Sequence, residues 1–415
     1  MEDTLKPPLN LCNYSGGCFA AGDLRANEQI VLASMHTMWV REHNRLAAFL
    51  KHVNPSWHAE KVFQEARKIV IAELQHITYT EYLPKLLGED AIPSYSGYDD
   101  TLDATIFNSF ATSAFRAGHS MIRPGFSRLN AFYEPTGPDV PLVKAFFNNR
   151  LLHNEGIEPF ILGLLANYSQ TVDRGMAVGL TQHLFQQPGS KHGFNLAALN
   201  IQRGRDHGLP GYGSWRRECG LPQAFLFRDT RSEIKDRKTH NILKELYKSF
   251  ALEHMDLWVA GLAEDPVPGA MVGPTFHCIL KRQFLRLRDG DRFWYENPDV
   301  FTTEQLSEIK KMSLSKVVCD NLFGVVSAQK DAFVTATKES QRVECIFGFE
   351  AMNMNMSKWK GEEYVLEWEE GKKGGRWEWS NNNDNNYNYY YKNNYSKEER
   401  RERENGGKEG RKEGR

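Results

Sequence analysis

The chain opens with two long segments in which apolar residues recur every three to four positions. Residues 25–53 and 56–88 both follow this pattern, and the second segment runs into Pro84 and Gly88. This period is typical of amphipathic α-helices, and proline and glycine commonly mark a helix end. The pattern therefore predicts two long helices, each with one face buried in a core.

A third segment, TIFNSFATSAFRAGH at 105–119, has the same period and predicts a helix that ends on His119. We expect its apolar residues to face inward, namely Ile106, Phe107, Phe110, Ala114 and Phe115. Further helical patterns occur at 192–202, 233–253, 275–287 and 303–323. Few segments alternate with the period of two that a half-buried strand requires, so the predicted fold class is mainly α.

The composition changes after about residue 350. An Asn/Tyr-rich tract and then a Lys/Glu/Arg/Gly-rich tract follow, without a continuous apolar face. Such segments bury too little apolar surface to offset the entropy of ordering. We expect a folded domain at 1–350 and a low-complexity, disordered tail at 351–415.

The charge balance excludes some classes of partner. The 415 residues include 52 Lys+Arg and 53 Asp+Glu, so no overall field would attract nucleic acid or an anionic membrane. No apolar run approaches the roughly 20 residues of a spanning helix. The first residues also lack the basic and apolar regions of a secretory signal. We therefore expect no nucleic-acid partner and no membrane span.

The 6 cysteines do not form a Cys-x-x-Cys motif, so zinc-ribbon and thioredoxin interpretations are weak. They are either buried thiols of a cytosolic protein or disulfides of an exported one. Four Asn-x-Ser/Thr sequons fit export but are frequent by chance, namely Asn13, Asn167, Asn355 and Asn394.

Three short stretches pair polar residues three positions apart, which places both members of each pair on one helix face. The pairs are Arg25 with Glu28, Arg116 with His119, and Asn200 with Arg203. Taken singly, each pair has a structural explanation, as a surface charge pair, a solvated face or a helix cap.

Taken together, the stretches resemble signature blocks of a known family. GDLRANEQ, FRAGHSMI, LNIQRGRDHGLPGY and LRDGDRFWYENPDVF, in this order, are similar to blocks of the animal haem peroxidases, the family of myeloperoxidase and peroxidasin. The resemblance runs from about Cys12 to Cys345, and its RANEQ and QRGRDHG variants are most like those of peroxidasin. It implies a mainly helical haem-peroxidase fold.

The resemblance assigns the proximal side of a haem b. His119 matches the axial ligand of the iron, and Gly118 leaves room for the macrocycle to approach. Asn200 matches the asparagine that accepts a hydrogen bond from the ligand histidine and makes it a stronger electron donor. Arg116 and Arg203 match the arginines that pair with the haem propionates.

On the distal side, Arg25 matches the catalytic arginine that stabilises charge on the departing peroxide oxygen. Glu28 matches the glutamate that forms an ester with a haem methyl group. The family's distal histidine, its second ester-forming aspartate and its calcium-binding loop lie upstream of the matched blocks, so we expect an N-terminally truncated domain without them. We do not expect His36, His43 or His76 to replace the distal histidine.

The resemblance also implies three disulfides, Cys12–Cys18, Cys219–Cys278 and Cys319–Cys345, and an extracellular setting. It implies a peroxidase that reduces hydrogen peroxide and oxidises a halide or a phenolic donor such as a matrix tyrosine. The expected loss of the distal histidine would lower activity, since such acid–base help contributes ~10²–10⁴-fold. The alternative is a non-catalytic fragment that binds haem or extracellular matrix.

Overall fold

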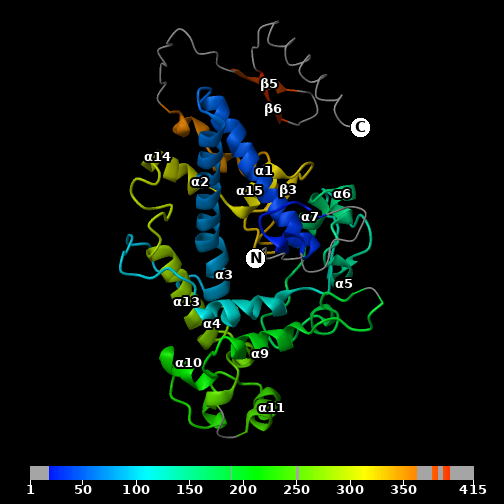
Figure 1. Ribbon diagram of the computed structural model, residues 1–415, viewed down its shortest axis with the longest axis vertical. Coiled ribbons are helices and arrows are strands. Elements are labelled where there is room, and N and C mark those ends of the chain that lie inside the picture. The colour runs from blue at the N-terminus through cyan, green and yellow to red at the C-terminus, as the bar shows by residue number, and fades with distance from the viewer. Residues whose placement is uncertain (1–17, 188, 249–251, 362–375, 382–386, 393–415) are drawn as a thin grey trace, which may run out of the picture.

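The computed structural model describes residues 18–187, 189–248 and 252–361, together with two strands further on, β5 (Arg376–Asn381) and β6 (Tyr387–Lys392). The described chain is mainly helical, which confirms the predicted class, and its strands form three two-stranded sheets. The helices α1 (Ile30–Val53) and α2 (Ala59–Ile77) lie side by side along the long axis of the molecule (Figure 1). A lobe that contains α10 (Tyr212–Glu218) and α11 (Arg237–Tyr247) forms the lower end of the molecule in Figure 1, away from the junction of α1 and α2.

The first predicted helix is present but begins later than expected. A 3₁₀ turn, η1 (Leu24–Asn27), precedes α1, and Gln29 caps the helix by accepting a hydrogen bond from the backbone N–H of Val31 at 2.8 Å. This cap satisfies a backbone donor that the first helical turn leaves free. Glu28 therefore lies at the junction of the two elements.

The second predicted helix continues past α2 through a π-helical turn, η2 (Thr78–Tyr82), into α3 (Leu83–Leu87). Pro84 lies in the first turn of α3 and does not end the helix. The wider turn before it explains this, because a proline inside regular α-helix would clash with the carbonyl four residues earlier. Gly88 ends the segment with a φ of 97°, a conformation that favours glycine.

The third predicted helix is wrong in two respects. It is split at Ser113 into α4 (Asn108–Thr112) and a 3₁₀ segment, η3 (Ala114–Met121). The tighter 3₁₀ turn rotates the side chains after the break, and Phe115 is 47% exposed. Its ring still stacks on the buried Phe110, whereas Ile106 lies before the helix and is 50% exposed, so Ile106 does not face the core as we expected.

The later helices are shorter than their patterns predict. The segment 303–323 is interrupted between α14 (Thr303–Ile309) and α15 (Leu314–Asn321), where Ser313 caps the second helix. The other patterns correspond to α9 (Leu196–Asp206), α11 and α13 (Pro274–Asp289). The remaining elements are β1 (Gly125–Phe126), β2 (Val140–Pro141), α5 (Leu142–Ala145), α6 (Arg150–Glu155), α7 (Glu158–Ala166), α8 (Val178–Thr181), η4 (Phe227–Thr230), η5 (Leu252–His254), α12 (Leu257–Ala263), β3 (Ser327–Gln329), β4 (Arg342–Glu344), η6 (Glu350–Met352) and η7 (Met356–Trp359).

Packed structure continues beyond residue 350. Met356 and Trp359 of η7 are buried against Leu46 and Leu50 of α1. Further on, β5 and β6 pair as an antiparallel hairpin, which the sequence did not predict. The rest of the predicted tail lies outside the described residues.

Two of the three disulfides implied by the resemblance are present. Cys219–Cys278 joins the end of α10 to α13, and Cys319–Cys345 joins α15 to the residue after β4. In the chain-entropy model, closing a loop of 59 residues stabilises a fold by roughly 4 kcal/mol. The third predicted pair involves Cys12, which lies outside the described residues.

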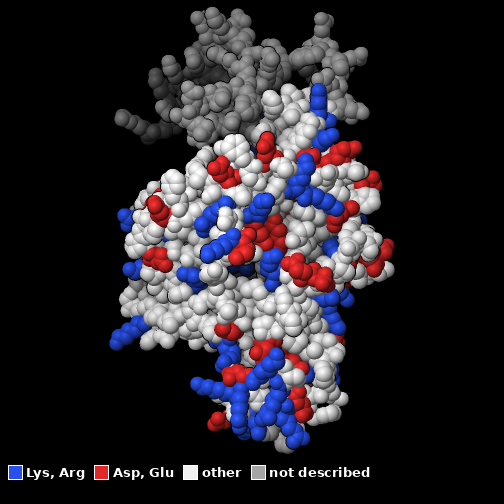
Figure 2. Space-filling model, turned by 180° about the vertical axis from the view of Figure 1, so that it is seen from behind, with Lys and Arg blue, Asp and Glu red and all other residues white. Residues whose placement is uncertain are grey.

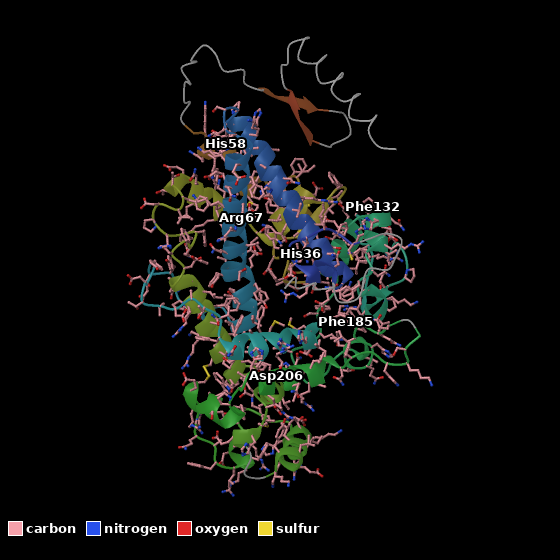
Figure 3. All side chains as sticks on the ribbon, in the orientation of Figure 1. His36, His58, Arg67, Phe132, Phe185 and Asp206 are labelled. Atoms are coloured by element: carbon pink, nitrogen blue, oxygen red, sulfur yellow. A yellow bond between two sulfur atoms is a disulfide. The ribbon has the colours of Figure 1, made fainter. Side chains whose placement is uncertain are left out.

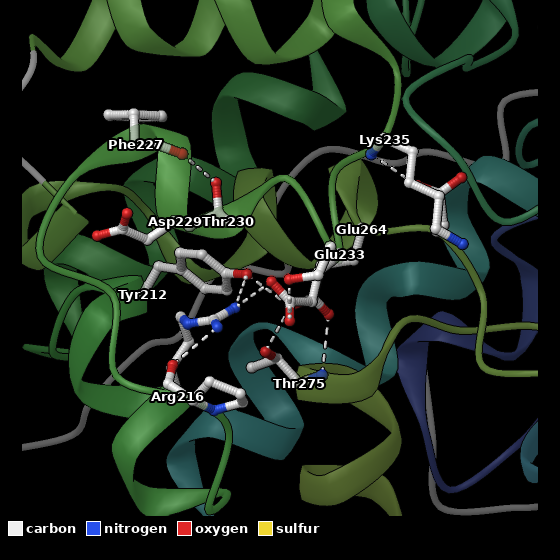
Figure 4. A network of polar contacts seen from close by, with 12 residues as sticks. Tyr212, Arg216, Phe227, Asp229, Thr230, Glu233, Lys235, Glu264 and Thr275 are labelled. Atoms are coloured by element: carbon white, nitrogen blue, oxygen red, sulfur yellow. Dashed lines mark hydrogen bonds and ion pairs between the residues drawn. The ribbon is translucent and has the colours of Figure 1, made fainter.

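A buried polar network holds the lobe together (Figure 4). Arg216, 1% exposed, donates to Glu233 at 2.7 Å and to the Tyr212 hydroxyl at 3.0 Å. Tyr212 in turn donates to Glu264 at 2.7 Å, and Glu264 also accepts from the Thr275 hydroxyl at 2.6 Å. Buried charges need such partners, so this network joins α10 to α13 and to the segment after α12.

This network predicts a pH dependence of stability. Burial raises the pKa of Glu264 to about 7 from an ordinary 4.5, so the folded chain keeps a proton that the unfolded chain releases. The free energy of unfolding should therefore fall as pH rises from 4.5 through 7, by about 2–3 kcal/mol from this group. Denaturant titrations from pH 5 to 8 should show this loss in the wild type and not in Glu264→Gln. If the free energy of unfolding changed equally with pH in the two proteins, Glu264 would not be the titrating group.

Candidate functional site

The structure brings His119 and Asn200 together, although 81 residues separate them. The Asn200 side-chain nitrogen lies 2.9 Å from Nδ1 of His119, which leaves Nε2 free of any protein partner among the described residues. Asn200 is completely buried on α9, and His119 is half-buried near the end of η3. A histidine with one ring nitrogen held by a side chain and the other without a protein partner can serve as a metal ligand once Nδ1 carries the ring proton.

Contacts from other elements fix the 3₁₀ segment that positions His119. The Trp258 indole N–H of α12 donates to the Arg116 carbonyl at 3.3 Å. The buried Ser120 hydroxyl accepts from the backbone N–H of Asp173 at 3.3 Å. On the facing helix, Asn195 caps α9 by accepting from the Ala198 N–H at 3.0 Å. The two elements that present His119 and Asn200 are therefore both anchored.

The imidazole of His119 is neutral at physiological pH. Burial lowers the pKa of His119 to about 4, the nearby Arg116 guanidinium acts in the same direction, and the Asn200 hydrogen bond opposes both. A neutral imidazole has a lone pair available for a metal ion, whereas an imidazolium has none.

His119 lies in the wall of a cavity of about 570 Å³. Glu28 and Gln29 line the same cavity from the junction of η1 and α1, and Arg123 is its other charged lining residue. Most of the wall is apolar, including Phe126, Leu142, Phe146, Phe160, Leu180, Leu184, Phe185 and Leu196. The volume lies within the ~300–1,000 Å³ that is typical of small-molecule sites. A cavity of this size with few polar groups in its wall suits a large apolar ligand.

The guanidinium group of Arg116 lies beside the histidine, and it is close enough to Arg203 for the two charges to interact. Arg116 donates to the side-chain oxygen of Asn200 at 3.2 Å and to the Ala111 carbonyl at 3.0 Å, and no carboxylate pairs with it within the described chain. Burial and the neighbouring Arg203 both lower the pKa of Arg116. Arg203 is about half exposed and lies 4.0 Å from Asp206 at the end of α9 (Asp206 is labelled in Figure 3). The pair is suited to bind carboxylates of a ligand.

Glu28 is a half-buried carboxyl group that lines the cavity, whereas neither Arg116 nor Arg203 lines it. Burial raises the pKa of Glu28, and the charge of Arg25 partly offsets this effect. The buried Asn27 beside it exchanges hydrogen bonds with the Phe19 backbone at 2.9 Å and accepts from Asn149 at 2.6 Å. The Glu28 carbonyl also accepts from the Phe147 N–H at 3.0 Å, so the backbone that presents the carboxyl group is well anchored.

Comparisons with known proteins place this chain in a family. The sequence profile described as animal haem peroxidase matches residues 3–333. The chain is 47% identical over 326 residues to the peroxidasin homolog of Mus musculus, covering 77% of this chain and 22% of that protein. It is 46% identical over 328 residues to lactoperoxidase of Mesocricetus auratus, covering 76% and 46%. The chain belongs to the animal haem peroxidase family.

The structure is similar to a solved member of this family. Peroxidase A from Dictyostelium discoideum matches with a TM-score of 0.69 and 39% identity, over 76% of this chain and 59% of that one. The chain thus spans only part of the curated relatives named above, less than half of lactoperoxidase and about a fifth of the peroxidasin homolog.

The residues present fit the haem that this family implies. A Cβ atom at Gly118 would meet nothing within 4 Å, so the protein itself gives no steric reason for glycine there. Gly118, Arg116 and His119 line a second space of about 520 Å³, which shares His119, Met121 and Leu196 with the first cavity. Together with the neutral imidazole and the unpaired guanidinium, this space is what a haem with two carboxylates needs.

Arg25 is not where the resemblance led us to expect it. Its side chain is 80% exposed and pairs with Asp23, with its Nε 3.0 Å from the carboxylate, and it does not line the cavity. Asp23 accepts from both the backbone and the guanidinium of Arg25, and this hydrogen bonding lowers the pKa of Asp23 to about 2. The local ion pair explains why the structure turns this guanidinium toward solvent.

The amide of Asn200 is reversed relative to the expected arrangement. Its nitrogen faces His119 and its oxygen faces Arg116, whereas an iron-binding Nε2 requires Nδ1 to hold the proton and donate it to the amide oxygen. A rotation of 180° exchanges the two amide atoms with little change in shape. The hydrogen bond that Arg116 donates explains the present orientation.

Two residues of the cavity wall, Arg123 and Phe185, were not predicted from the sequence. Arg123 donates to the Tyr168 carbonyl at 2.9 Å and is an additional cation at the cavity. Phe185, labelled in Figure 3, has a φ of 51°, which is rare for a non-glycine residue, and its ring contacts Phe146 and Phe147. Neither residue lies in a periodic pattern that would have indicated its place.

Other sequence candidates lie away from the cavity. His36 is exposed on α1, His43 contacts the Phe63 carbonyl at 3.2 Å, and His76 is buried against the Tyr295 hydroxyl at 3.0 Å. The Asn167 sequon is unsuited to carry a glycan, because its amide donates to the Gly163 carbonyl and its side chain lines the cavity.

Proposed function

We propose that this domain is a haem-dependent peroxidase that reduces hydrogen peroxide while it oxidises a halide or a phenolic donor. The observation that carries this proposal is His119, which lines an apolar cavity, has Asn200 at its Nδ1, and has no protein partner at Nε2 among the described residues. Family membership supports the same conclusion. When bound, haem iron supplies the capacity to take two electrons from the donor and pass them to peroxide.

The proximal residues have separate roles in this proposal. His119 binds the iron through Nε2, and Arg116 and Arg203 bind the two carboxylates. In the structure Arg116 donates a hydrogen bond to the side-chain oxygen of Asn200. When Arg116 instead binds a haem carboxylate, this hydrogen bond breaks and the Asn200 oxygen is left without a donor. Asn200 can then rotate and accept the Nδ1 proton of His119, which raises the basicity of the ligand.

The distal residues act on peroxide and on haem attachment. We infer that Arg25 leaves Asp23 and turns toward the cavity, because its backbone lies three residues from the cavity residue Glu28. There its charge stabilises negative charge on the departing oxygen. Glu28 would hold the haem covalently, through an ester in which a carboxylate oxygen replaces one hydrogen of a haem methyl group; hydrogen peroxide would take up the two electrons and the proton. We assign no described residue to the calcium ion that the resemblance implies.

The proposed ester bond predicts that a Glu28 variant loses covalent attachment of haem. Wild-type protein that has been loaded with haem and treated with a little peroxide should retain haem after extraction with acidified organic solvent, whereas Glu28→Gln should release it. Non-covalent haem binding should stay within about threefold, because an amide keeps the shape of the carboxyl group. Haem staining of denaturing gels measures the outcome. Retention of haem by Glu28→Gln would contradict the role of Glu28.

We propose an extracellular setting and, as one substrate class, tyrosine side chains of matrix proteins. The disulfides Cys219–Cys278 and Cys319–Cys345 support an oxidising compartment. The described chain contains no helix long and apolar enough to cross a membrane. We also propose one peroxidase domain followed by a low-complexity tail. The domain extends beyond the predicted boundary at residue 350, because Met356 and Trp359 are buried against α1.

The function is tested with haem-loaded protein, hydrogen peroxide and free tyrosine. We expect peroxide-dependent dityrosine fluorescence well above that of free haem at the same concentration, and bromide should compete with tyrosine for oxidation. Haem binding without any dityrosine or bromide oxidation would overturn the catalytic proposal and favour a non-catalytic haem-binding domain. Failure to bind haem would overturn both.

A further inference from the structure

The lobe at the end of the molecule carries a cluster of exposed cations that the haem site does not use. Figure 2 shows Lys and Arg side chains gathered on this lobe, at the lower end of the view. The exposed cations in and before α11, here called the basic surface, are Arg231, Lys235, Arg237, Lys238, Lys244 and Lys248. In the described part of the chain, none of them forms an ion pair, although nearby Arg174 and Arg228 do.

Three of the nearby carboxylates are directed at backbone donors, and none of the three pairs with the cations of the basic surface. Asp236 caps α11 by accepting from the N–H groups of Lys238 and Thr239. Asp229 accepts from two backbone N–H groups at 2.9 and 3.0 Å, and Asp265 accepts from the Lys235 N–H at 2.8 Å. The cations of the basic surface are therefore available to an external anion.

The spacing of the cations along α11 forms a stripe. Arg237 and Lys244 are seven residues apart, which places them on one face over about 10 Å of α11, and Lys248 follows directly after the helix ends at Tyr247. Lys244 and Lys248 border a shallow depression of about 460 Å³ together with Asn241 and Glu245. Buried residues Thr239, His240 and Leu243 hold the opposite face against the lobe, so the stripe is presented rigidly.

We propose that the basic surface binds a sulfated polysaccharide. A linear stripe of unpaired Lys and Arg matches a linear polyanion, and guanidinium and ammonium groups bind oxyanions such as sulfate. Residues 228–248 present no exposed aromatic side chain on which nucleic-acid bases could stack. The disulfide Cys219–Cys278 in the same lobe supports the extracellular setting proposed above, where sulfated polysaccharides are common polyanions. This proposal does not depend on haem.

The test measures binding of the full chain to immobilised heparin at several salt concentrations. The variant Arg237→Gln/Lys244→Gln/Lys248→Gln should bind at least tenfold more weakly, and the slope of log affinity against log salt should fall by about two to three. The control Lys144→Gln/Arg150→Gln/Lys338→Gln removes the same number of exposed, unpaired charges elsewhere and should change affinity less than twofold. Glu245→Gln removes the acid beside the stripe and should strengthen binding about twofold.

Competition identifies the partner class. Soluble heparin should displace the chain, whereas fully desulfated heparin should not. Equal losses in the two triple variants would overturn the proposal, because binding would then follow overall charge. Tighter binding of duplex DNA or of anionic phospholipid vesicles than of heparin, with the same loss in the α11 variant, would assign the surface to that partner and also overturn the proposal. Circular dichroism of each variant confirms that the helix is retained.

Discussion

Replacement of His119 by glycine should abolish the haem absorption band of the reconstituted protein near neutral pH. The side chain supplies the only histidine ring in the described wall of the cavity, so its removal leaves the iron without an axial protein ligand. We expect haem affinity to fall by about 10²-fold or more, since loss of a residue that merely orients a metal ligand already costs ~10–100-fold. Added imidazole should restore the band, because the vacated space can hold a free ring.

A matched control separates ligation from stability. His192 is exposed in the loop before α9, and His192→Gly removes a histidine without touching the cavity. This variant should bind haem as the wild type does, with or without imidazole. If His119→Gly retains the wild-type spectrum, His119 is not the ligand. If imidazole fails to rescue a folded His119→Gly protein, the vacated space is not the haem site.

Replacement of Arg25 by alanine should slow the reaction of the haem-loaded protein with hydrogen peroxide about 10²–10³-fold. A charged donor aimed at developing negative charge typically contributes this much to a rate. Haem content should be unchanged, since Arg25 makes no contact with the proximal residues in the structure. Stopped-flow absorbance at increasing peroxide concentrations gives the second-order rate constant directly.

Asp23 provides the complementary test. Because Asp23 holds Arg25 in solvent, Asp23→Asn should free the guanidinium and leave the peroxide reaction as fast as, or faster than, in the wild type. An Arg25→Ala protein with the wild-type rate constant would show that this arginine stays in solvent when haem is bound. A slow Asp23→Asn protein would show that the ion pair itself positions Arg25.

The sequence predicted the elements whose pattern is local and periodic. The helices α1 and α2 follow from their apolar stripes, because one buried face repeats along many turns. The break at Ser113 and the π turn before Pro84 were not predictable, since they depend on how neighbouring elements pack. Two consequences are the partial exposure of Phe115 and the 3₁₀ geometry around His119.

The residues of the candidate site could be predicted only from the resemblance of whole sequence blocks to those of a known family. Arg116, His119, Asn200 and Arg203 come from two distant segments, and their spacing alone also fitted ordinary surface pairs. The structure brings His119 and Asn200 into contact, but it turns Arg25 away and reverses the Asn200 amide. Both departures follow from short-range polar contacts, with Asp23 and Arg116, that a sequence pattern does not encode. The apolar cavity wall was missed because its residues come from many separate elements.

The central claim is that Nε2 of His119 binds haem iron while Asn200 holds Nδ1. Resonance Raman spectroscopy of the reduced, haem-loaded protein tests it most directly, because the iron–histidine stretching band reports both the bond and the hydrogen bond behind it. We predict that the wild type shows this band, that Asn200→Ala shifts it to lower frequency, and that His119→Gly with imidazole shows a different band. An identical band in the wild type and in imidazole-free His119→Gly would contradict the claim.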